Sequence, residues 1–127
     1  MRSYIVLAAV FAFTAMPGGM AAKADEPSVL DVSVVANADG TYGFSATVAH
    51  RDEGWKHYAN KWDIVTPDNK VIGERLLFHP HVDEQPFVRS LGRVAVPIGV
   101  TEVTVRAYCN ITGAGSRTFT VKLPPRK

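Results

Sequence analysis

Apolar and polar residues alternate along two stretches of the chain, residues 41–50 and 102–109. Successive side chains of a β-strand point to opposite faces, so this period of two predicts strands with one buried face. His50 and Cys109, the last residues of the two runs, stay in phase with the apolar positions and are predicted to point into the core. The apolar residues that share their phase are Tyr42, Phe44, Ala46 and Val48 in the first run and Val103, Val105 and Ala107 in the second.

The rest of the chain after residue 27 repeats this pattern in short segments separated by turn residues, such as Pro67-Asp-Asn69 and Pro97-Ile-Gly99. Seven short strands at this spacing are typical of an immunoglobulin-like antiparallel β-sandwich, and no helix is expected after residue 24. The predicted strands lie near 30–34, 41–50, 58–66, 71–78, within 87–96, 102–109 and 119–123.

Residues 1–24 have the features of a secretory signal peptide. Arg2 provides the positive charge, a short apolar stretch follows, and Ala22-Lys-Ala24 forms a small-residue cleavage site. The apolar stretch is shorter than the roughly 20 residues that a membrane-spanning helix needs. We therefore expect a periplasmic protein exported by the general route, with residues 25–127 folded as one immunoglobulin-like domain.

The charge of the chain changes when this leader is removed. The full chain has 14 basic and 12 acidic residues, and the leader contains two of the basic ones, Arg2 and Lys23. The mature domain therefore carries 12 of each and has no net charge with its histidines neutral. This balance gives no reason to expect nucleic acid or a membrane surface as a partner.

All four histidines and the single cysteine fall in or beside three predicted loops. In a Greek-key sandwich, successive connections alternate between the two ends of the domain, so these three loops are predicted to meet at one end. Imidazole and thiolate groups together suit a transition-metal site. The candidate metal ligands are His50, His57, His79, His81 and Cys109.

Each candidate also has an interpretation without a metal. His50 could be a hydrogen-bonded core histidine, and His79 and His81 could be exposed loop residues. Cys109 could be a buried thiol or form a disulfide with a partner. Four acidic residues near these loops could be hard ligands, but they are more often a solvated rim: Asp52, Glu53, Asp83 and Glu84.

The segment Tyr108-Cys-Asn-Ile-Thr-Gly113 resembles the C-N-x-H-G signature of superoxide reductases of the desulfoferrodoxin and neelaredoxin type. That family has a seven-stranded immunoglobulin-like domain in which four histidines and one cysteinate hold ferrous iron. The chain departs from the family at Thr112, which replaces the signature histidine, and it has no N-terminal E-K-H segment before His50. The resemblance implies a divergent member, with His79 and His81 available as replacement ligands.

The resemblance implies a non-haem Fe(II) site that reduces superoxide to hydrogen peroxide by one-electron transfer. Superoxide, or another small oxygen species, is the partner that it implies. The electron donor and the oligomeric state are not indicated by the sequence. Lys56 is the candidate catalytic residue, because its charge, with that of Arg51, could draw an anion to the metal. Two alternatives stay open: a non-catalytic copper or zinc protein, and a metal-free sandwich that serves as a carrier or interaction module.

Overall fold

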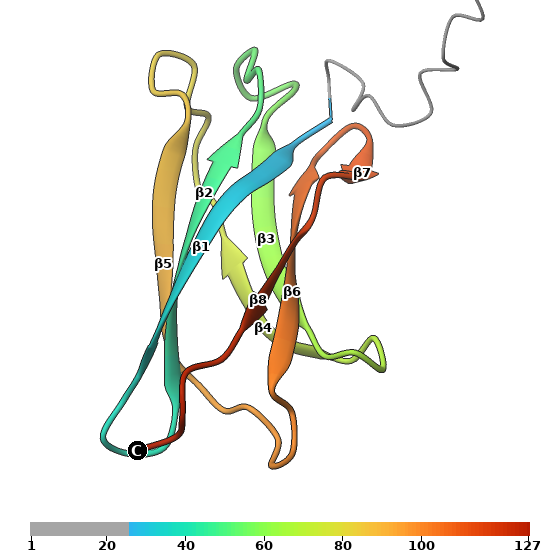
Figure 1. The fold of residues 1–127 in the computed structure, drawn as a ribbon. Coiled ribbons are helices and arrows are strands. Elements are labelled where there is room, and N and C mark those ends of the chain that lie inside the picture. The colour runs from blue at the N-terminus through green and yellow to red at the C-terminus, as the bar shows by residue number, and fades with distance from the viewer. Residues whose placement is uncertain (1–25) are drawn as a thin grey trace, which may run out of the picture.

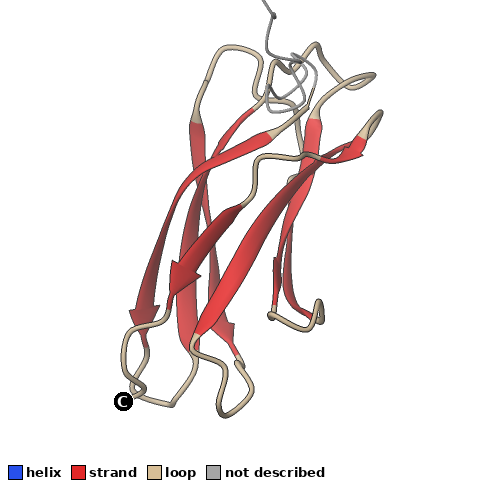
Figure 2. Cartoon of the chain, turned by 45° about the vertical axis from the view of Figure 1, so that its right-hand side comes forward, coloured by secondary structure: helices blue, strands red, loops and turns tan. Residues whose placement is uncertain are grey.

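The computed structural model describes residues 26–127. These residues form strands joined by loops and turns, with no helix among them (Figure 2). The described residues therefore include no helix long and apolar enough to cross a membrane. The expected signal peptide, residues 1–24, lies outside the described residues.

Two antiparallel sheets make up the domain (Figure 1). One sheet has the order β1-β2-β5, and the other has the order β4-β3-β6-β7 with β8 also paired to β6. This arrangement confirms the predicted all-β sandwich. The strands are β1 (Ser28–Ala36), β2 (Tyr42–Ala49), β3 (Ala59–Val65), β4 (Val71–Leu76), β5 (Phe87–Val94), β6 (Glu102–Cys109), β7 (Gly113–Ala114) and β8 (Phe119–Lys122).

Residues 26–127 form one strand more than the seven predicted, the two-residue β7. Gly113 has a φ of 73°, a conformation that glycine adopts without steric cost, and the chain turns back there onto the end of β6. Cys109 pairs with Gly113 in this short ladder. The turn after the cysteine is therefore folded tightly against it.

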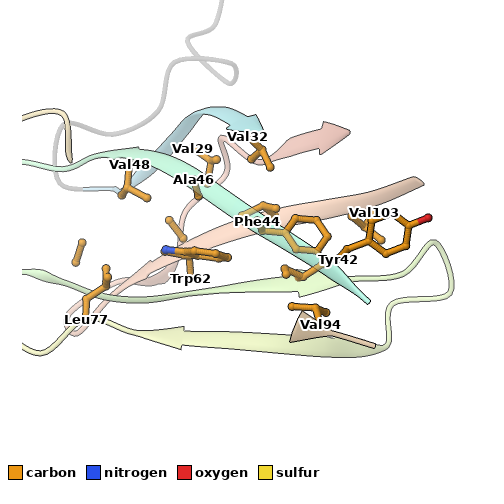
Figure 3. Packing of buried hydrophobic residues seen from close by; sticks show 14 of the residues in the cluster. Val29, Val32, Tyr42, Phe44, Ala46, Val48, Trp62, Leu77, Val94 and Val103 are labelled. Atoms are coloured by element: carbon orange, nitrogen blue, oxygen red, sulfur yellow. The ribbon is translucent and has the colours of Figure 1, made fainter. Parts of the chain in front are cut away.

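The core lies between the two sheets (Figure 3). Trp62, Phe44 and Phe87 are its largest fully buried side chains. Every second residue of β2 and β6 is buried, as the alternation predicted. His50 and Cys109 follow the same phase and are only 4% and 2% exposed, which confirms that both belong to the buried face.

Three loops meet at the end of the sandwich opposite the C-terminus (Figure 1). They are the β2–β3 loop over residues 50–58, the β4–β5 loop over 77–86 and the β6–β7 loop over 110–112. This confirms the predicted grouping of the two loops that carry the histidines with the loop that follows Cys109.

Candidate metal centre

His50, His57 and Cys109 converge at this end of the domain. One potential ligand atom from each residue lies within 4.8 Å of the other two. The rings of His50 and His57 meet edge to face, with their centroids 4.8 Å apart. Two imidazoles from the β2–β3 loop and a thiol from the end of β6 thus surround one small volume, an arrangement that could hold a metal ion.

Both imidazoles are held by a carboxylate at Nδ1. The Nδ1 of His50 is 2.5 Å from Oδ1 of Asp52, and the Nδ1 of His57 is 3.0 Å from Oε1 of Glu53. An ionised carboxylate only accepts hydrogen bonds, so each Nδ1 is the donor and each neutral ring keeps its lone pair on Nε2. Carboxylates orient metal-binding histidines in this way in many proteins.

The Nε2 atom of His57 is buried, and no hydrogen-bond partner for it is found among residues 26–127. A buried polar atom without a partner is uncommon and often marks a site for an ion or water. The Glu53 carboxylate raises the pKa of His57 against the opposing effect of burial, and the neighbouring Cys109 adds to the rise. A metal ion at Nε2 would satisfy this atom and compete with its proton.

The thiol of Cys109 lies in surroundings that favour its ionised form. Its Sγ is 3.0 Å from the hydroxyl oxygen of Thr112 and accepts a hydrogen bond from the Thr112 backbone N–H at 3.2 Å. Burial by itself raises the pKa of Cys109, but the contacts with Thr112, Ile111 and His57 outweigh it and lower the pKa from 9.0 to about 7. A thiolate is the form of cysteine that binds metals.

Asn110 places His57 beside Cys109 by fastening the β2–β3 loop to the end of β6. Its side-chain amide donates to the carbonyls of Trp55 and Lys56, at 3.3 and 3.2 Å, and its Oδ1 accepts the Tyr58 N–H at 2.9 Å. The Cys-Asn pair thus provides one possible ligand and the clamp for the loop that carries another.

His79 and His81 lie at the same end of the domain but outside the group formed by His50, His57 and Cys109. The Nε2 of His81 is 2.8 Å from a guanidinium nitrogen of Arg89, which can only donate, so its lone pair is already occupied. Burial, with the charges of Arg89 and His79, lowers the pKa of His81. The structure therefore does not bring these two histidines together with the other three candidates.

Lys56 and Arg51, the cations expected near the site, are exposed residues of the β2–β3 loop. Thr112 is exposed as well, and its contact with Cys109 places it beside the site, where the family signature has histidine.

Asp52 is a residue of the candidate centre for which the sequence favours the wrong position, a solvated rim. It is only 5% exposed, and its carboxylate is bonded to His50. Its position two residues after His50 continues the period-two phase of buried residues in β2, and that phase was the available signal.

No model of a known protein family matches the chain. A protein of Halomicrobium mukohataei named "Putative lipoprotein" is 34% identical over 96 residues, which are 76% of this chain and 47% of that protein. The chain thus spans about half the length of this curated relative. Among solved structures, superoxide reductase (1Fe-SOR) from Giardia intestinalis matches with a TM-score of 0.46 and 17% identity, over 72% of this chain and 95% of that chain.

Proposed function

We propose that this chain is an exported metal-binding protein with a centre formed by His50, His57 and Cys109, and that it reduces superoxide to hydrogen peroxide. The convergence of two imidazoles and a thiol within 4.8 Å carries the proposal. Iron is the proposed metal because the Tyr108–Gly113 segment resembles the superoxide reductase signature.

Bound Fe(II) would supply the electron that, with two protons from water, converts superoxide to hydrogen peroxide, and a separate electron donor would then reduce the iron again. The side chains hold the ion: the imidazoles of His50 and His57 are neutral donors, and Cys109 is an anionic one. Lys56, exposed on the loop of His57, would attract the superoxide anion by its charge.

Export is the other part of the proposal. The features of residues 1–24 are those of a signal peptide, and the name of the Halomicrobium mukohataei relative as a lipoprotein is in keeping with an envelope location. We propose the periplasm as the compartment of the mature domain. Binding to a metal there would protect a lone thiol from oxidation.

A second candidate function, the binding of copper or zinc without catalysis, is favoured by the composition of the group. Two histidines and one cysteine are the ligands of many copper electron-transfer sites, and histidine and cysteine are also the common protein ligands of zinc. His79 and His81, which would complete a four-histidine iron site, lie outside the group.

Anaerobic metal titration of the purified mature domain tests the proposal. We expect Fe(II) and Cu(II) to bind, and the Cu(II) form, or the iron form after oxidation to Fe(III), should show a visible thiolate charge-transfer band that Cys109→Ser abolishes while the fold is retained. His50→Ala should weaken binding by more than about 100-fold, because it removes a ligand and not a supporting group. His79→Ala is the matched control, and an equal loss in this variant would place His79 among the ligands.

Measurement of activity toward superoxide distinguishes the two candidate functions. For an iron protein of the proposed function, superoxide should be consumed with formation of hydrogen peroxide and without release of dioxygen. Lys56→Ala should slow this reaction most at low ionic strength, where the attraction between charges is least screened. Tight binding of copper or zinc with no reaction toward superoxide would instead support the second candidate.

A further inference from the structure

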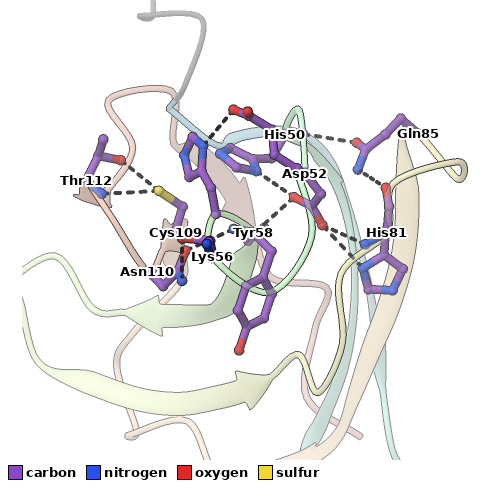
Figure 4. Close-up of polar contacts among 12 residues, drawn as sticks. His50, Asp52, Lys56, Tyr58, His81, Gln85, Cys109, Asn110 and Thr112 are labelled. Carbon is purple, nitrogen blue, oxygen red and sulfur yellow. Dashed lines mark hydrogen bonds and ion pairs between the residues drawn. The ribbon is translucent and has the colours of Figure 1, made fainter.

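The Asp52 carboxylate is fully buried where the β2–β3 and β4–β5 loops meet (Figure 4). Its Oδ1 accepts hydrogen bonds from Nδ1 of His50 at 2.5 Å and from the Ala59 N–H at 3.0 Å. Its Oδ2 accepts the His81 N–H at 2.7 Å. Burying a carboxylate is costly unless it is paired and hydrogen-bonded, so this residue holds three segments of the chain together.

The contact with Asp52 determines how His50 faces its neighbours. Because the carboxylate accepts at Nδ1, the ring is held as the Nδ1–H tautomer and rotation of the ring is opposed. The side chains of both residues are fully buried, so water does not offer a competing partner at Nδ1. The lone pair of His50 is thus kept on Nε2, the ring nitrogen that Asp52 does not contact, and this is the nitrogen that would bind a metal in the group with His57 and Cys109.

Gln85 also links the backbone at His50 to the backbone at His81 in the β4–β5 loop (Figure 4). Its Oε1 accepts the His50 N–H at 3.0 Å, and its Nε2 donates to the His81 carbonyl at 2.8 Å. The backbone of His81 is therefore held on both sides, by Asp52 at its N–H and by Gln85 at its carbonyl. The ring of His81 is stacked on Phe87 with the centroids 3.9 Å apart, which anchors the β4–β5 loop to β5.

From these contacts we infer that Asp52 is the positioning residue of the metal centre and that the β4–β5 loop, through His81 and Gln85, supports it. The inference rests on the proposed metal-binding function. It gives the His79-Pro-His81 segment a role different from ligation: His81 contributes its backbone and its packing, and the metal is bound by His50, His57 and Cys109.

The test compares Asp52→Asn with the unchanged mature domain, using Zn²⁺ as the probe. In the metal-free protein, long-range ¹⁵N–¹H NMR of the histidine rings should show His50 as the Nδ1–H tautomer. Asp52→Asn should produce a mixture of tautomers at His50 and weaken Zn²⁺ binding by about 10- to 100-fold, measured by chelator competition. Asp83→Asn, an exposed acid on the β4–β5 loop, is the matched control and should change neither quantity.

Gln85→Ala is a second test variant, to be used if circular dichroism shows that Asp52→Asn does not fold. It removes both side-chain bonds of the loop support and should weaken Zn²⁺ binding several-fold while Cys109 remains a ligand. Unchanged affinity and tautomer in the folded variants would overturn the inference with the proposed function intact. Failure of the unchanged domain to bind Zn²⁺, Fe(II) or copper would overturn the proposed function itself, and with it the inference.

Discussion

Replacing Thr112 by valine should raise the pKa of Cys109 in the metal-free protein. Thr112 contacts Sγ twice, through its hydroxyl at 3.0 Å and its backbone N–H at 3.2 Å, and valine keeps only the backbone contact. A hydrogen bond to a charged group contributes about 1.5–3 kcal/mol, and one pKa unit corresponds to about 1.4 kcal/mol. The pKa, about 7 in the unchanged protein, should therefore rise by roughly one to two units.

Thiolate absorbance in the far ultraviolet measures this change. Cys109 is the only cysteine in the sequence, so a single titration step reports one group. Thr120→Val is the matched control, because the Thr120 hydroxyl bonds to that of Thr104 and not to the cysteine. A midpoint near 9 in the unchanged domain, or the same midpoint in Thr112→Val, would refute the reasoning that these contacts stabilise the thiolate.

Three further predictions concern groups around the site and on the outer face of the β3–β6 sheet. Burial, followed by the hydrogen bond to Asp63, raises the pKa of Tyr108 to about 12. The contribution of the protonated Tyr108 hydroxyl to stability is thus complete below pH 10 and is lost as the pH rises from 10 to 12. A tyrosinate absorbance step at high pH should report this ionisation and should disappear in Tyr108→Phe. Asp63→Ala should lower the free energy of unfolding by about 3 kcal/mol in urea titrations, because Asp63 is buried and its two bonds from Arg106, at 2.9 and 2.8 Å, would be lost. Asn110→Ala should leave the fold intact but weaken metal binding at least several-fold by isothermal titration, because the loop that carries His57 would lose its clamp; equal binding would show that the clamp is dispensable.

The strand pattern predicted the buried half of the site. His50 and Cys109 end strands whose alternation is enforced by a two-sided core, so a shift by one residue would expose every apolar side chain of the strand. Their inward direction therefore followed from the sequence alone. The grouping of the loops at one end followed from the order of the strands.

The contacts within that end could not be predicted in the same way. Loop residues have no fixed period, and whether His81 meets a metal or Arg89 depends on how the β4–β5 loop packs on β5. Acids in loops are usually solvated, so the sequence favours the surface for Asp52. Its burial depends on backbone N–H donors from Ala59, at the start of β3, and from His81, in the β4–β5 loop, and the loop packing that brings these donors to Asp52 has no signal in the sequence.

X-ray absorption spectroscopy of the mature protein isolated from its native envelope tests the central claim most directly, because it identifies the metal and its ligands together. We predict a transition metal with one sulfur neighbour at about 2.3 Å and imidazole nitrogens closer in, at about 2.0–2.1 Å, with the sulfur absent in Cys109→Ser. Protein isolated without a stoichiometric metal, or a metal with no sulfur neighbour, would contradict a centre built on His50, His57 and Cys109.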